Sequence, residues 1–129
     1  MILLDTHIFV DLMLGRPLPF VAEYLSGKTS VSAVTAAELG CLQRLDRLRL
    51  DLPADRWLDV ATAAAGIVVI PATAGHLARA MLDSWSHRDP ADRILVQHLR
   101  ERHDLELHTR DARILEYAGE CKLAVRDCR

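Results

Sequence analysis

Short apolar runs alternate with longer amphipathic segments along this chain. The first run, residues 2–4, ends at Asp5. Such a short apolar run is typical of a buried parallel strand, and here an acid would lie at its carboxyl end. The clearest run, residues 67–70, follows Gly66. Further strands are expected from Val31, over residues 105–108 and over residues 123–125. Strands that alternate with helices predict a three-layer α/β/α fold around a central, mostly parallel sheet of roughly four or five strands.

Helices are expected in the segments between these runs. The expected helices cover residues 7–14, 18–26, a longer segment opened by Thr35, 53–65, 73–83, 90–103 and 109–117. Pro53 and Pro90 suit the first turn of a helix, where a missing amide hydrogen leaves no bond unmade. The pattern contains no repeat and no linker, which favours a single domain over residues 1–129.

Composition narrows the class of protein without identifying it. Half of the 129 residues are hydrophobic, which suits one compact core, and the formal net charge of −2 does not indicate a nucleic-acid binder through bulk electrostatics. The three cysteines lack metal spacing, and no basic leader precedes the first apolar run. The longest apolar stretch, residues 63–71, is far shorter than the ~20 residues of a membrane span. We therefore expect a cytoplasmic protein that does not enter a membrane.

Acidic residues gather where the expected strands end and the expected helices begin. They are Asp5, Glu38, Asp89, Asp92 and Asp111. In open α/β sheets this edge binds ligands. Taken singly, each helical acid is explained equally well as a cap, because free amides and the helix dipole stabilise acids there. Thr35 with Glu38 fits a capping box, for example.

Convergence of these acids argues for chemistry instead of capping. Several carboxylates at one sheet edge repel one another and raise each other's pKa unless a cation neutralises them. Carboxylate oxygens without paired His or Cys ligands favour Mg²⁺ or Mn²⁺, and Mg²⁺ is commonly shared with substrate phosphates. The sequence therefore predicts a metal site that acts on a phosphate ester.

The acidic blocks, in this order and spacing, resemble those of PIN-domain nucleases, and most closely VapC-like toxins. The blocks are Leu3-Leu4-Asp5-Thr6-His7, Thr35-Ala36-Ala37-Glu38-Leu39, His87 to Leu95 with its Asp-Pro-Ala-Asp-Arg core, and His108-Thr109-Arg110-Asp111. The resemblance implies a PIN-like fold and a Mg²⁺- or Mn²⁺-dependent endoribonuclease that leaves a 5′-phosphate and a 3′-hydroxyl. It also implies a homodimer that is inhibited by a small cognate antitoxin protein.

Residue by residue, the resemblance assigns the catalytic and metal-binding quartet to Asp5, Glu38, Asp92 and Asp111. Asp89 lies one turn before Asp92, and which of the two contacts the metal is left open. Next to these acids, Thr6 and Thr109 are candidates for positioning water or phosphate oxygens. Candidates for contacting the RNA backbone, or for pairing with the acids instead, are Arg88, Arg93 and Arg110.

Two other readings of the chain compete with the nuclease. A phosphotransfer enzyme of the haloacid-dehalogenase type also uses an acid after the first strand, but it needs a second Asp two residues later and a well-placed lysine. Here Asp5 is followed by Thr6 and His7, and the two lysines lie elsewhere.

The other reading is a non-catalytic binding module in which the acids only cap helices. Trp57 and Trp85 are both expected to pack in the interior.

Overall fold

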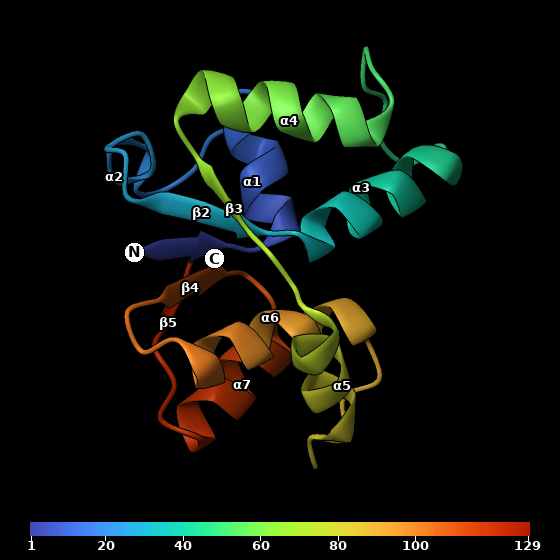
Figure 1. The fold of residues 1–129 in the computed structure, drawn as a ribbon. Coiled ribbons are helices and arrows are strands. Elements are labelled where there is room, and N and C mark those ends of the chain that lie inside the picture. The colour runs from blue at the N-terminus through green and yellow to red at the C-terminus, as the bar shows by residue number, and fades with distance from the viewer.

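A computed structural model describes residues 1–129 as five strands and seven helices (Figure 1). The strands are β1 (Ile2–Leu4), β2 (Thr29–Ser32), β3 (Val68–Ile70), β4 (Glu106–Thr109) and β5 (Val125–Asp127). The helices are α1 (Thr6–Met13), α2 (Val21–Tyr24), α3 (Val34–Arg44), α4 (Ala54–Ala65), α5 (Ala74–Leu82), α6 (Pro90–Glu101) and α7 (Ala112–Glu120). The predicted alternation of strands and helices is confirmed.

The five strands form one parallel sheet in the order β3-β2-β1-β4-β5. The chain runs outward from β1 to β2 and β3, and then crosses back to add β4 and β5 on the other side of β1. This change of direction makes the carboxyl ends of β1 and β4 a topological switch point, where the following segments diverge and leave room for a ligand. Asp5 follows β1 and Asp111 follows β4, so both acids lie at this point.

Two apolar cores lie on opposite faces of the sheet, which gives the predicted three layers. Helices α1, α3 and α4 lie on one side of the sheet in Figure 1, and α5, α6 and α7 on the other. Adjacent strand residues serve different cores, because side chains alternate across a strand. Leu3 packs with Leu95, Leu107 and other residues of the second face, whereas Leu4 packs with Phe9 and others of the first.

The ends of the longest helices follow local sequence rules. Helix α6 begins as expected, with Asp89 at the N-cap and Pro90 in the first turn. Helix α4 ends at Gly66, whose φ of 67° is in the left-handed region that favours glycine. Both helices are twelve residues long, and no helix of the chain has the length and apolar character needed to cross a bilayer.

Several expected boundaries are wrong. Only Val21–Tyr24 is helical within the predicted segment 18–26. The last helix begins at Ala112 and not at Thr109, because Thr109 is still part of β4 and Asp111 caps the helix. The clearest predicted strand, residues 67–70, is present as β3, where it forms one edge of the sheet and leaves Val68 and Val69 exposed.

Candidate active site

A polar cavity of about 380 Å³ opens at the carboxyl edge of the sheet. No hydrophobic residue lines it. Its lining consists of Asp5, His7, Asp11, Glu38, Asp89, Asp92, Arg110 and Asp111. All five acids singled out from the sequence thus face one space, together with a sixth, Asp11. They come from segments far apart in the chain, so the fold itself produces this concentration of charge.

Asp5 is held in place by the neighbouring strand. Its carboxylate is almost fully buried, and Oδ2 accepts a hydrogen bond of 2.6 Å from Thr109 Oγ1 at the end of β4. Thr109 Oγ1 also accepts a bond of 3.0 Å from the amide of Asp111. Asp5 occupies the N-cap position of α1, but its side chain makes no capping hydrogen bond. A cap therefore does not explain this acid.

Glu38 is held by a second threonine, and the expected capping box is not formed. Helix α3 begins at Val34, which places Glu38 beyond the first turn. Its Oε1 accepts a hydrogen bond of 2.6 Å from Thr6 Oγ1, and Thr35 Oγ1 lies 2.9 Å from the same hydroxyl. Thr35 and Glu38 therefore meet through Thr6 of another helix and not through the helix backbone, which overturns the capping interpretation for Glu38.

Asp92 is held by a histidine. Its Oδ2 lies 2.6 Å from Nε2 of His87, and both side chains are largely buried. His87 belongs to the loop between α5 and α6, so this contact fixes the loop to the first turn of α6. One carboxylate oxygen of Asp92 is thereby committed, while the side chain still lines the cavity.

Asp89 and Asp111 do cap helices. Asp89 Oδ1 accepts from the amides of Ala91 at 2.9 Å and Asp92 at 3.5 Å. Asp111 Oδ1 accepts from the amides of Arg113 at 2.9 Å and Ile114 at 3.1 Å. The capping interpretation is correct for these two residues. Because each cap uses Oδ1 alone and both residues line the cavity, capping leaves the other oxygen of each available to a ligand.

Burial and mutual repulsion disfavour the charged forms of three of these acids. Burial is the main cause that raises the pKa of Asp5, with repulsion from Asp111 adding to it. Burial, followed by repulsion from Asp5, Asp92 and Asp89, raises the pKa of Glu38 to about 7. Burial, followed by repulsion from Asp89, Asp5 and Asp111, raises the pKa of Asp92 to about 6. The hydrogen bonds from Thr109, Thr6 and His87 oppose these shifts without cancelling them.

The profile of the PIN domain family matches residues 2–120, which is nearly the whole chain. The chain belongs to the PIN domain family. PIN domains are generally metal-dependent nucleases, so membership places the protein among hydrolases that act on nucleic acids. A comparison with curated proteins returned no match. No lysine lines the cavity of this PIN domain, so the lysine that a haloacid-dehalogenase-type reaction requires is not in place.

The cavity of this PIN domain suits a hard cation in composition, but it is not a closed metal cage. Nowhere in the structure do three His, Cys, Asp or Glu side chains stand close enough to hold a metal ion between them. Mg²⁺ retains several waters and normally takes one or two protein carboxylates directly. A lining of six carboxylates, three of which have raised pKa values, therefore fits such an ion without a complete set of protein ligands.

The residues expected to contact substrate have mixed positions. Thr6 and Thr109 are fully buried and donate to Glu38 and Asp5, so in this structure they position carboxylates and do not line the cavity. Arg110 lines the cavity and pairs with Asp11. Arg88 is exposed at the mouth of a neighbouring cavity.

Arg93 has a different role from the one expected. Its guanidinium donates to five backbone carbonyl groups, those of Ala80, Met81, Asp83, Trp85 and His87. All five belong to the end of α5 or to the loop that follows it. Arg93 therefore folds the loop that carries His87, and it does not line the acidic cavity. In this structure its donors are taken by the chain's own carbonyl groups and not by an acid of the cavity.

Sequence reasoning missed two residues of the site. Asp11 lies one helical turn after His7 on α1, and both line the cavity. This spacing of four residues was the available signal for Asp11. Salt bridges from Arg110 and Arg16 overcome the effect of burial and lower the pKa of Asp11. His87 was missed because nothing in a sequence indicates which acid a loop histidine will contact.

Proposed function

We propose that this PIN domain is a Mg²⁺- or Mn²⁺-dependent endoribonuclease that acts as a VapC-like toxin. The single observation that carries the nuclease part is the cavity lining: six carboxylates converge from separate parts of the chain, and only Arg110 and His7 accompany them. A fold does not gain stability from such a cluster, because burial and repulsion disfavour the charged forms. A bound divalent cation removes this cost.

Asp5, Glu38, Asp92 and Asp111 are the residues that we assign to the metal, with Asp89 beside them. When bound, a divalent ion supplies an activated water and neutralises charge on the scissile phosphate. The protein's own contribution is to hold the carboxylates in fixed orientations, through Thr109 for Asp5, Thr6 for Glu38 and His87 for Asp92. Asp92 is the better direct ligand of the pair, because its side chain is largely buried at the cavity whereas Asp89 is exposed.

The phosphate backbone of RNA requires cations near these acids, although the chain as a whole carries a net charge of −2. Arg110 extends into the acidic cavity, and Arg88 and Arg113 line the cavity next to it. These few arginines, whose planar guanidinium groups match a phosphate, would thus attract RNA locally even though the chain has no net positive charge.

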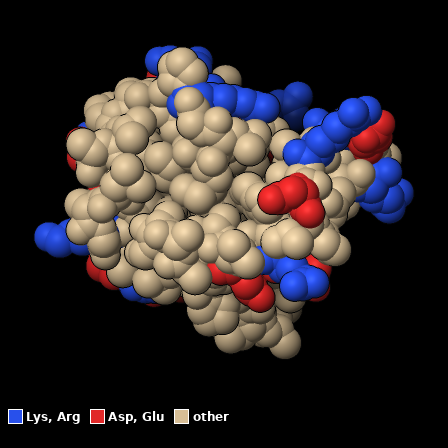
Figure 2. All heavy atoms as spheres, turned by 90° about the horizontal axis from the view of Figure 1, so that it is seen from above, with Lys and Arg blue, Asp and Glu red and all other residues tan.

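The toxin assignment rests on the acidic blocks, which resemble those of VapC-like proteins, and on the surface. Seen over α4, the molecule presents a broad area that is largely free of charged side chains (Figure 2). Val60 on α4 is 57% exposed, and an apolar hollow of about 360 Å³ lies beside it, lined by Met13, Leu52 and Trp57 among others. Apolar surface of this kind supports the expectation of a homodimer and of a bound antitoxin.

Cleavage of RNA by the purified chain tests the nuclease proposal. We expect cleavage with Mg²⁺ or Mn²⁺, none in excess EDTA, and none from Asp5→Asn. The matched control is Asp55→Asn, because Asp55 is an exposed acid in the first turn of α4, away from the cavity. Undiminished cleavage in EDTA, or equal cleavage by Asp5→Asn and Asp55→Asn, would overturn the proposal.

Light scattering at micromolar concentration tests the association. We expect the mass of a dimer for the free chain, and a Val60→Asp variant that shifts toward the monomer mass. A wild-type chain that is monomeric under these conditions contradicts the homodimer. Co-purification of a small protein encoded beside this chain, with loss of RNA cleavage in the complex, tests the antitoxin.

A further inference from the structure

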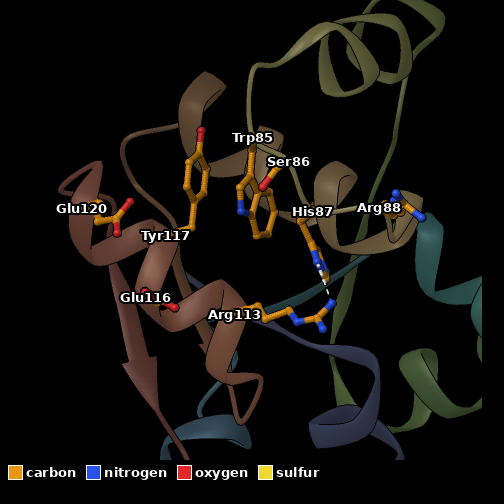
Figure 3. A pocket seen from close by; sticks show the side chains of 8 residues that line it. All are labelled: Trp85, Ser86, His87, Arg88, Arg113, Glu116, Tyr117 and Glu120. Atoms are coloured by element: carbon orange, nitrogen blue, oxygen red, sulfur yellow. Dashed lines mark hydrogen bonds between the residues drawn. The ribbon is translucent and has the colours of Figure 1, made fainter.

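A second cavity lies next to the acidic one. It has a volume of about 540 Å³ and opens between the loop that follows α5 and the outer side of α7 (Figure 3). The loop contributes Trp85, Ser86, His87 and Arg88, and α7 contributes Arg113, Glu116, Tyr117 and Glu120. Trp85 was expected to pack in the interior, but it is only half-buried and lines this cavity.

One wall of the cavity is a column of three aromatic rings. Tyr117 and Trp85 are stacked, with centroids 4.4 Å apart and planes within 4°, and His87 follows at 4.6 Å from Trp85. Arg100 also lies over the Tyr117 ring, with Cζ 5.4 Å from the ring centroid. Because the ring faces are covered by their neighbours, the cavity meets the column along ring edges. Ring edges carry partial positive charge and pack favourably against the π face of another ring.

The column is fixed by polar contacts that reach beyond the cavity. Tyr117 Oη donates to Asp83 Oδ2 at 2.9 Å and also receives a hydrogen bond from Arg100. At the other end of the column, His87 contacts Asp92 of the acidic cavity. A ligand that lies against these rings is therefore held on a rigid wall whose far end touches the candidate active site.

Charge is distributed unevenly along the cavity. Arg88 lies immediately before Asp89, and Arg113 lies two residues after Asp111, so both cations border the acidic cavity. Neither pairs with a carboxylate, and Arg113 Nη1 lies 3.5 Å from His87 Nδ1. Glu116 and Glu120 lie at the opposite side of the cavity in Figure 3. The cavity is thus cationic near the acids and anionic away from them.

This polarity matches one nucleotide of a single-stranded RNA. Its phosphate suits the arginine end, where it adjoins the acids that would act on the neighbouring phosphodiester. Its base suits the aromatic wall, because the ring edges that face the cavity pack favourably against the π face of a base. At the far end, carboxylates accept hydrogen bonds from amino groups such as that of cytosine, whereas uracil has no amino group to offer.

We propose that this cavity binds the nucleotide next to the scissile phosphate of single-stranded RNA and prefers a base that carries an amino group. The proposal rests on the nuclease function proposed above, but its test does not depend on turnover. Binding is measured in an Asp5→Asn background with Mg²⁺, using fluorescein-labelled hexaribonucleotides of cytidine and of uridine. The readouts are fluorescence anisotropy and the emission of Trp85.

We expect the cytidine hexamer to bind about fivefold more tightly than the uridine hexamer, equivalent to one hydrogen bond. Adding Arg113→Gln should weaken binding of both hexamers about tenfold, because a charged contact is lost. The double change Glu116→Gln and Glu120→Gln should abolish the preference for cytidine. Binding should quench tryptophan emission, and Trp85→Phe should remove the quench, since Trp57 packs against Phe9 in the other core.

Matched controls lie on exposed surface outside the cavity: Arg56→Gln for Arg113→Gln and Glu23→Gln for the two glutamates. Equal binding by Arg113→Gln and Arg56→Gln, an unchanged base preference in the double variant, or a quench that survives Trp85→Phe overturns the proposal. The proposal is also overturned if neither hexamer binds and a co-purifying protein is found to cover Trp85, because the cavity would then bind a protein and not RNA. If wild type does not cleave RNA but the hexamers bind as expected, the nuclease proposal fails and the binding proposal stands.

Discussion

Glu38 and Glu101 are both glutamates on helices, yet their surroundings shift the pKa of the two side chains in opposite directions. Glu101 accepts hydrogen bonds from His76 Nδ1 at 2.5 Å and Arg79 Nε at 2.6 Å. Although burial opposes them, these bonds and one from Gln97 lower the pKa of Glu101 to about 2. Glu38 receives one hydroxyl, from Thr6, and faces other acids, so its pKa rises to about 7.

The comparison separates carboxylates that stabilise the fold from those that it merely tolerates. Around Glu101 the chain provides its own hydrogen-bond donors, from His76 and Arg79, and these contacts join α5 to α6. Around Glu38 and Asp92 the contacts with Thr6 and His87 do not offset burial and mutual repulsion, so the pKa values of both acids stay raised. Strongly perturbed acids in a cleft are typical of functional sites, where a ligand offsets the cost of burial and repulsion.

The largest expected effect is on catalysis. Glu38→Gln should reduce RNA cleavage at least ~100-fold, since loss of even an outer-shell partner of a metal commonly costs about 10–100-fold. Glu101→Gln should leave cleavage within about threefold of wild type, because this residue does not line the acidic cavity. Initial cleavage rates at saturating Mg²⁺ measure both, and similar losses in the two variants would erase the distinction between the regions.

The two regions should also respond to pH with opposite signs. The folded state raises the pKa of Glu38 to about 7 from its ordinary value of 4.5, so it binds more protons between these values and loses stability as pH rises. In EDTA, wild type should lose about 2 kcal/mol more than Glu38→Gln in unfolding free energy between pH 5 and pH 8. Urea titrations measure the difference. For Glu101 the lowered pKa gives stability that is present above about pH 4.5 and lost as pH falls toward 2.

Replacing Glu101 should weaken the fold without affecting the metal response. Glu101→Gln leaves the buried ring of His76 without its carboxylate, and the expected loss is about 1.5 kcal/mol at pH 7, allowing for the partial exposure of Glu101. The loss should be the same in EDTA and in Mg²⁺. A loss that appears only with Mg²⁺ would show that this cluster belongs to the metal site after all.

A smaller effect is expected from the positioning threonine. Thr6→Val keeps the side-chain shape but removes the donor to Glu38, so the Mg²⁺ concentration for half-maximal cleavage should rise about tenfold. Thr62→Val is the matched control, because Thr62 is also buried but donates to the carbonyl group of Leu58 on α4. A Mg²⁺ requirement that shifts equally in both variants would indicate a general effect of losing a buried hydroxyl group.

The fold and the location of the acids followed from local patterns in the sequence. The run before Asp5 and the Asp-Pro start of α6 are decided by neighbouring residues, and the structure has both as predicted. The exposure of β3 could not be predicted, because strand order in the sheet decides which strand lies at the edge. The apolar run of residues 67–70 would look the same in the sequence whether the strand lay at the edge or in the centre of the sheet.

The side-chain contacts within the site were less predictable. Thr35 and Glu38 have the spacing of a capping box, but both side chains bond to the hydroxyl group of Thr6 from another helix. Arg93 sits beside an acid in sequence, yet its donors are taken by carbonyl groups of a folded loop. Partners of this kind depend on tertiary structure, and no spacing along the chain encodes them.

Thermal unfolding in EDTA and in Mg²⁺ tests the central claim most directly, with wild type, Asp5→Asn and Asp55→Asn compared. If the acids of the cavity form a metal site, wild type gains stability from Mg²⁺, because a ligand that binds only the folded state stabilises it. Asp5→Asn should melt at the same or a higher temperature than wild type in EDTA and gain less from Mg²⁺, whereas Asp55→Asn should show the full gain. An Asp5→Asn variant that melts lower in EDTA, together with a wild type that is indifferent to Mg²⁺, would contradict the account.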